Sequence, residues 1–164
     1  MNRADNIISL RPITIEDTDL MVKWRNRDFV KRNYINQSEF TREGHLKWME
    51  TRVQTGQVIQ FIILENDRPI GSVNMKDVDY EKGTAEYGIF IGEKDALGKG
   101  YGSETAKQVV RLAKEKYHLK KLFLRLYEDN IPAYRSYLSA GFKKIEDECA
   151  IENDRKVIFM ELEL

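Results

Sequence analysis

The chain has 164 residues, 41% of them hydrophobic and 33% charged, which fits a single soluble domain, residues 1–164, with an ordinary core. Its 27 lysines and arginines balance 27 aspartates and glutamates, so no net charge favours a nucleic acid or a membrane surface as a partner. The single cysteine, Cys149, excludes an internal disulfide and a thiolate metal cluster, and the lack of a signal-like start or a long apolar run predicts a cytoplasmic location.

The first half of the sequence predicts one strand, two helices and then three strands. Residues 7–13 alternate apolar and polar side chains, as a strand does. Thr14 and Asp17 have the spacing of a helix capping box, and a polar linker leads to a second helix over about 41–53. The alternating stretches 58–65, 70–79 and 84–92 are joined by turns too short for a parallel crossover. We therefore expect these three strands to be antiparallel.

The second half begins with glycines at every second position, Gly98, Gly100 and Gly102, followed by an amphipathic helical pattern from Ala106 to Tyr117. A strand over 121–127, a short helix after it and two alternating stretches, 142–148 and 157–164, complete the chain. The short helix has capping residues before it and a glycine after it. This order of elements predicts a single α+β domain.

The glycine stretch matches neither of the common nucleotide-binding loops. The Walker pattern is absent, and Gly98, Gly100 and Gly102 give G-x-G-x-G where a dinucleotide fingerprint needs G-x-G-x-x-G. The backbone N–H groups of such a stretch can still converge at a helix N-terminus, where the helix dipole favours an anion. A plain turn before a capped helix explains the glycine spacing equally well, so the spacing leaves both interpretations open.

Together with residues 129–142, the glycine stretch resembles the GNAT acetyl-CoA N-acetyltransferase superfamily. Its phosphate-binding signature is Q/R-x-x-G-x-G/A; Gly100 and Gly102 match the glycines, whereas Leu97 stands in place of the usual Gln or Arg. The second signature is matched by Asn130, Ala133, Tyr137, Gly141 and Phe142. The resemblance covers nearly the whole chain and implies the GNAT fold, a three-layer α+β architecture. In that fold about four helices flank a splayed, mixed and mostly antiparallel sheet of about seven strands.

On the donor side, the resemblance implies direct transfer of an acetyl group from acetyl-CoA, without a metal. The strand that contains Phe90 and Ile91 would pair with the pantetheine arm, Asn130 would add a hydrogen bond to this arm, and Arg135 or Lys99 would meet the 3′-phosphate. The pyrophosphate would be bound by the backbone of Gly98, Lys99, Gly100, Tyr101, Gly102 and Ser103.

For the chemical step, Tyr137 occupies the family's general-acid position and would protonate the departing thiolate. Glu86 is the candidate base, acting through a water, with His45 and Glu128 as reserves. A backbone N–H near Ile91 is the expected oxyanion donor. The alternatives are structural: Tyr137 as a core aromatic residue and Glu86 as an outward-facing strand residue.

The acceptor amine is expected to lie against residues 21–50, which are basic and aromatic and so suit a sugar, a base or a phosphate. This segment resembles the N-acetyltransferases of UDP-linked 4-amino sugars in pseudaminic-acid synthesis, with Arg25, His45 and Trp48 as substrate contacts. The partner would then be a nucleotide-linked small-molecule amine, and the enzyme a monomer or homodimer. Three alternatives remain: a Rim-type acetyltransferase of ribosomal protein N-termini, a polyamine or other small-molecule acetyltransferase, and a non-catalytic acetyl-CoA-binding module.

Overall fold

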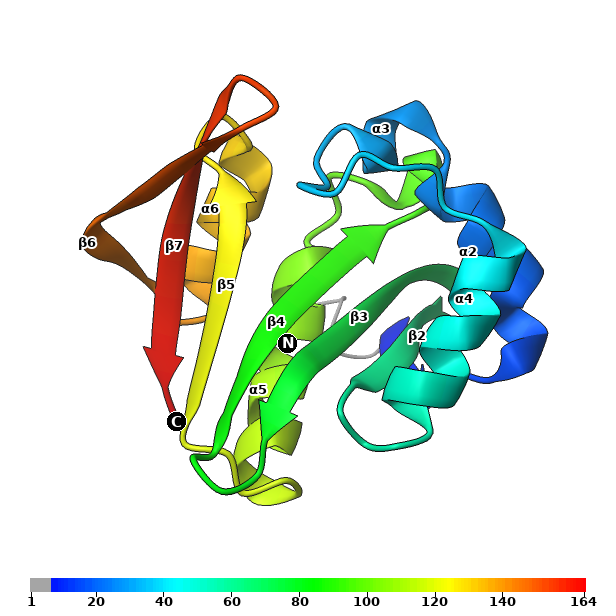
Figure 1. Ribbon diagram of the computed structural model, residues 1–164, viewed down its shortest axis with the longest axis horizontal. Coiled ribbons are helices and arrows are strands. Elements are labelled where there is room, and N and C mark those ends of the chain that lie inside the picture. The colour runs from blue at the N-terminus through cyan, green and yellow to red at the C-terminus, as the bar shows by residue number, and fades with distance from the viewer. Residues whose placement is uncertain (1–6) are drawn as a thin grey trace.

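The computed structural model describes residues 7–164, and in this part of the chain seven strands form one sheet (Figure 1). The strands lie in the order β1-β2-β3-β4-β5-β7-β6, and every neighbouring pair is antiparallel except β4 with β5. Their bounds are Ile8–Pro12 (β1), Ile59–Glu65 (β2), Arg68–Asp79 (β3), Thr84–Ile91 (β4), Lys121–Tyr127 (β5), Lys143–Glu152 (β6) and Arg155–Glu163 (β7). The predicted α+β fold with a mixed, mostly antiparallel sheet is confirmed.

Helices cover both faces of this sheet (Figure 1). One face carries α5 (Tyr101–Glu115) and α6 (Ile131–Ser139). The other carries α2 (Thr18–Arg25), α3 (Asp28–Lys31) and α4 (Arg42–Trp48), and the chain continues from α4 into a π-helical turn over Met49–Val53. Two short 3-10 turns, Ile15–Asp17 and Lys94–Ala96, precede α2 and α5. The single turn α3 is the helix that the sequence patterns did not predict.

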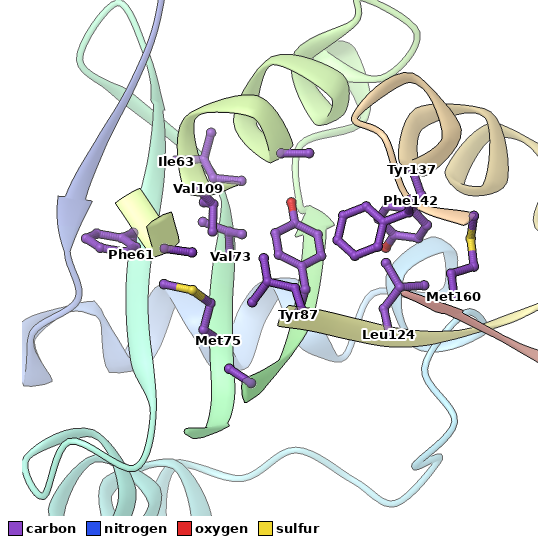
Figure 2. Close-up of a cluster of buried hydrophobic side chains, with 14 of the residues drawn as sticks. Phe61, Ile63, Val73, Met75, Tyr87, Val109, Leu124, Tyr137, Phe142 and Met160 are labelled. Carbon is purple, nitrogen blue, oxygen red and sulfur yellow. The ribbon is translucent and has the colours of Figure 1, made fainter. Parts of the chain in front are cut away.

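The larger core lies between the sheet and the helices α5 and α6 (Figure 2). Helix α5 contributes Ala106, Val109 and Ala113, which are fully buried at the three-to-four spacing of one helix face. Because two of these side chains are methyl groups, the helix lies close to Val73 and Tyr87 of the sheet. The apolar positions of the amphipathic pattern predicted for this helix therefore form its buried face.

The smaller core holds α2 against the end of β4. Trp24 is fully buried, donates its indole N–H to Glu93 at 2.8 Å, and packs edge-on against Phe90. A Cβ at Gly92 would lie 2.3 Å from Cγ of Trp24, so the close approach of the indole requires glycine at this position. This contact fixes the early helices beside the carboxyl end of β4.

Strands β4 and β5 pair only where Thr84–Glu86 face residues 121–123, and beyond this point they diverge (Figure 1). From Tyr87 to Ile91, β4 keeps β3 as its partner but has none on its other edge within the described residues. The rings of Tyr87, Tyr137 and Phe142 lie together on the α5 and α6 side of this divergence (Figure 2). The predicted splay of the sheet is thus present.

None of the helices among residues 7–164 is both long and apolar enough to cross a membrane. The prediction that the chain starts without a signal segment concerns positions that include residues 1–6, which lie outside the described residues.

Candidate functional site

A cavity of about 1360 Å³ opens where β4 and β5 diverge. It is larger than most pockets that hold one drug-sized ligand, so it has room for a long cofactor together with a second molecule. Its walls come from β4, the glycine stretch, the start of α6 and the segment 29–36 that contains part of α3. Residues from the predicted donor side and from the early helices therefore meet in one space.

The glycine stretch forms one end of this cavity in a left-handed backbone conformation. The φ angles of Gly98 and Gly100 are 74° and 82°, which side-chain-bearing residues rarely adopt. Gly100 is the N-cap of α5, and the first backbone hydrogen bond of the helix runs from the N–H of Glu104 back to Gly100. The N–H groups of the first helical turn before Glu104 are free of helical bonds and, with the helix dipole, suit an anion.

Of the predicted donor contacts, most lie on the cavity wall: Phe90, Ile91, Gly98, Gly100, Tyr101, Gly102, Ser103, Asn130 and Arg135. Lys99 is absent from this wall, so the structure favours Arg135 over Lys99 as the residue nearer a ligand phosphate. Asn130 caps α6, its side-chain oxygen accepting from the N–H of Ala133 at 3.5 Å. This is a long hydrogen bond, which leaves the Asn130 amide able to contact a ligand as well.

Two phenols lie beside each other at the divergence of the strands. Tyr137 of α6 is 8% exposed and packs perpendicular to Tyr87 of β4, with ring centroids 5.9 Å apart (Figure 2). Burial raises the pKa of Tyr137, and burial together with Tyr137 raises the pKa of Tyr87 well above its ordinary value. The Tyr87 hydroxyl is buried without a hydrogen-bond partner within residues 7–164. Both side chains are therefore protonated phenols at neutral pH.

On the opposite face of β4, Glu86 forms a cluster with two cations, which we call the vertex cluster: Lys76, Glu86 and Arg125. Lys76 Nζ lies 2.7 Å from Glu86 Oε2, and Arg125 Nε lies 2.9 Å from Glu86 Oε1. Each oxygen of Glu86 therefore has a cationic partner, and the two ion pairs hold the carboxylate in place on the strand. The prediction that Glu86 is the base remains untested, and this arrangement weakens the argument for it.

The tip of the β6–β7 hairpin, residues 152–155, holds the segment 32–36 across the cavity from β4. Arg155 donates to the carbonyl of Arg32 and is paired in bidentate fashion with Asp129. Asn153 donates to the carbonyl of Ile35 at 2.9 Å. These contacts fix a polar wall opposite β4 on the side where the acceptor is expected.

The three predicted acceptor contacts do not line the cavity. The Arg25 guanidinium is 3.5 Å from the ring centroid of Tyr34 and 4.6 Å from that of Phe40, and burial lowers its pKa. His45 is 2% exposed and packs against Phe40. Trp48 donates its indole N–H to Gln60 at 3.0 Å. Their role in acceptor binding stays a prediction, since in this conformation it is Tyr34 that reaches the cavity.

The sequence reasoning missed Tyr87, Lys76 and Arg125. Each carried a usable signal. Tyr87 follows Glu86 in a strand, so the two side chains must face opposite walls. Arg125 is a charged residue within an otherwise apolar strand, and Lys76 is the cross-strand partner of Glu86. The strand register, which the sequence does not specify, was needed to bring these residues together.

No group of three or more His, Cys, Asp or Glu side chains within residues 7–164 is arranged to hold a metal ion.

The sequence matches the Acetyltransferase (GNAT) domain family over residues 8–143. An uncharacterized protein of Methanocaldococcus jannaschii is 33% identical over 145 residues, which cover 85% of this chain and 29% of that protein. This chain therefore spans less than a third of the archaeal relative. Uncharacterized N-acetyltransferase p20 of Bacillus licheniformis is 26% identical over 144 residues, which cover 84% of this chain and 79% of that protein.

Among solved structures, spermidine N-acetyltransferase from Vibrio cholerae, in complex with CoA and spermine, is similar with a TM-score of 0.84. The match covers 96% of each chain at 16% sequence identity. At this identity the likeness shows a shared fold.

His45 makes the stability of the fold depend on pH. Both ring nitrogens are buried without a hydrogen-bond partner in the described part of the chain, and burial lowers the pKa of His45 from its ordinary 6.5. In the unfolded chain the imidazole takes a proton below about pH 6.5, whereas in the folded protein it resists protonation. The free energy of unfolding should therefore fall as the pH drops below 6.5, by at most about 1.4 kcal/mol per pH unit from this group.

Urea denaturation of wild type and His45→Leu at pH 7 and pH 5 measures this contribution, because the substitution removes the titration. We expect a smaller loss of stability toward pH 5 in the variant. His118→Asn is the matched control, since His118 is exposed and its φ of 53° suits asparagine. Parallel pH profiles for wild type and His45→Leu would contradict the assignment.

Proposed function

Because the chain belongs to the GNAT acetyltransferase family, we propose that it transfers the acetyl group of acetyl-CoA directly to the primary amine of a small molecule. One observation carries the proposal. A single cavity joins the free N–H groups before α5, the unpaired edge of β4 and the phenols of Tyr87 and Tyr137. These are the parts needed to bind a phosphate, hold an amide-containing arm and donate a proton at the far end of that arm. We propose further that residues 1–164 act as one such domain, as a monomer or homodimer.

The cavity supports a definite placement of the donor. The pyrophosphate of acetyl-CoA would accept hydrogen bonds from the backbone between Gly98 and Ser103, with Arg135 near the 3′-phosphate. The pantetheine amides would pair with the free edge of β4 at Phe90 and Ile91, as an added strand would. Asn130, on the wall between these two regions, would contact the arm.

The acyl transfer needs no covalent intermediate on the protein. The ammonium of the acceptor first gives up a proton to solvent in the open cavity. Its neutral nitrogen attacks the thioester carbon, a backbone N–H at the end of β4 near Ile91 stabilises the oxyanion, and the nitrogen of the adduct loses its second proton to solvent. The C–S bond then breaks and the thiolate leaves. Tyr137, which is 8% exposed and lines the cavity, would donate a hydrogen bond or its proton to that sulfur. The raised pKa keeps the phenol protonated and makes complete proton transfer harder, so we assign Tyr137 an accelerating but dispensable role.

For the acceptor, the relatives support a small-molecule amine better than either finer prediction from the sequence. The similar structure from Vibrio cholerae is a spermidine N-acetyltransferase in complex with CoA and spermine. The matched relatives give no support to a UDP-linked 4-amino sugar or to a ribosomal protein N-terminus. Arg25, His45 and Trp48 do not line the cavity, so contact with a nucleotide-linked acceptor bound there would require a rearrangement of the early helices.

Thiol release from acetyl-CoA, measured across a panel of primary amines, tests the function. We expect release with at least one amine and a fall in kcat of about 10- to 100-fold in Tyr137→Phe, since general-acid groups contribute about a hundredfold or more. The dissociation constant for acetyl-CoA should stay within about twofold, because phenylalanine preserves the ring contacts with Tyr87 and Phe142. Tyr117→Phe, two residues past the end of α5 and outside the cavity wall, is the control. Tight acetyl-CoA binding without release for any amine would indicate a binding module in place of an enzyme.

Gly100→Ala tests the phosphate-binding loop. Alanine is strained at the φ of 82° and adds a Cβ on the cavity wall, so acetyl-CoA should bind about tenfold more weakly by isothermal titration. Gly56→Ala is a matched control, because Gly56 has a φ of 81° but lies away from the cavity. Both variants should lose a similar stability, about 1–2 kcal/mol. Equal acetyl-CoA affinity in the two variants would contradict the assignment of this loop to the donor site.

A further inference from the structure

The vertex cluster lies at the point where the sheet splits. Lys76 of β3, Glu86 of β4 and Arg125 of β5 come from three adjacent strands, and Lys76 is the direct cross-strand partner of Glu86. Pairing of β4 with β5 ends at Glu86 and Phe123, two residues before Arg125. The ion pair from Arg125 to Glu86 therefore bridges the two strands at the start of their divergence, and all three side chains line the cavity.

The cluster carries one more positive charge than negative. Glu86 is 10% exposed at its side chain, while Lys76 and Arg125 are 32% and 38% exposed. Arg125 uses Nε for Glu86, and no partner for its Nη1 and Nη2 is found within residues 7–164. The carboxylate therefore holds two cations in place and neutralises only one of them.

Cationic side chains outnumber acidic ones over the whole cavity wall within the described chain, five against three: Arg32, Lys76, Arg125, Arg135 and Arg155 against Glu86, Asp129 and Glu152. The lining residues from 29 to 36 include Arg32 and no acid, and Asp129 is paired with Arg155. Glu152 is the remaining acid on the wall. A polycation such as spermine needs several carboxylates, whereas the fork of an arginine beside a lysine matches a carboxylate or a phosphate.

We propose that Lys76 and Arg125, positioned by Glu86, form a subsite for an anionic group of the acceptor, so that the enzyme selects amines that also carry a carboxylate or a phosphate. This selection rests on the proposed acetyl transfer and names its substrate class. The subsite lies one residue along β4 from Tyr87, on the opposite face of the strand, and both line the same cavity, so one small molecule can carry the anion and the reacting amine. Glu86 then acts as a positioning residue and not as the base.

Matched pairs of amines test the selection. Glucosamine 6-phosphate and glucosamine differ by a phosphate group. Glycine and glycinamide differ in that an amide replaces the carboxylate. Spermine represents a polycation. Thiol release from acetyl-CoA gives kcat/KM for each. We expect the member of at least one pair that carries the phosphate or carboxylate to exceed its partner in kcat/KM by about tenfold or more, and to exceed spermine, since hydrogen bonds to charged groups contribute at that level. The pair that shows the effect identifies the anion.

Variants of Arg125 locate the effect. Arg125→Gln should bring the ratio within the pair close to one, chiefly through KM, and Arg125→Lys should retain part of it because the charge remains without the fork. Lys121→Gln is the matched control on the same strand: it also loses ion pairs, to Glu161 and Glu163, but lies outside the cavity. It should keep the wild-type ratio. Higher kcat/KM for spermine or for the amines that lack an anionic group would overturn the subsite. An unchanged kcat/KM ratio in Arg125→Gln would also overturn it.

A binding measurement separates this inference from the proposed function. The anionic amines are titrated calorimetrically into CoA-saturated protein. Binding that weakens about tenfold in Arg125→Gln, without thiol release for any amine, would sink acetyl transfer and leave the anion subsite standing. Thiol release only with amines that lack a phosphate or carboxylate, together with no calorimetric binding of the anionic amines, would contradict the anion subsite and leave acetyl transfer standing.

Discussion

The early end of pairing between β4 and β5 is the constraint on which the site depends. Three residues of each strand are paired, and the next stretch of β4, from Tyr87 to Ile91, has β3 as its single neighbour within the described chain. Backbone N–H and C=O groups without partners are costly when they are buried in a dry interior. Here they line a cavity, where the amides of a ligand can complete the ladder. The sheet thus has room for an additional strand beside β4, in its middle. In most sheets an additional strand can pair only at an outer edge.

The two faces of this opening have different chemistry, because neighbouring residues of a strand point in opposite directions. On the α5 and α6 side, Tyr87, Tyr137 and Phe142 pack as aromatic rings, and the two tyrosines line the cavity. On the side of the early helices, Glu86 and Arg125 form ion pairs. The fold fixes the first face, which we propose as the donor side. A single substitution can change the charge of the second face. A polyamine acceptor of a structure with 16% identity therefore need not be the acceptor of this chain.

Much of the fold could be predicted from the sequence, because periodicity and turn residues act locally. The alternation in β2, β3 and β4 and the spacing of Ala106, Val109 and Ala113 in α5 were sufficient for that. The assignment of Gly100 and Gly102 to a donor loop depends on their spacing combined with a family signature and stays a proposal. The acceptor side could not be derived in the same way. The register that brings Lys76 and Arg125 to Glu86 and the hairpin contact of Arg155 with Arg32 join residues distant in sequence, and local patterns do not encode such contacts.

Backbone hydrogen–deuterium exchange at Gly88–Ile91, with and without CoA, tests most directly whether the vacant position beside β4 is the donor site. We expect the amides of this segment that face the cavity to exchange freely in the unliganded protein. They should become protected when CoA binds, because the pantetheine arm takes the place of a strand. Amides in β2, which is paired on both edges, should change little. Protection confined to the start of α5, with none along β4, would contradict the central claim.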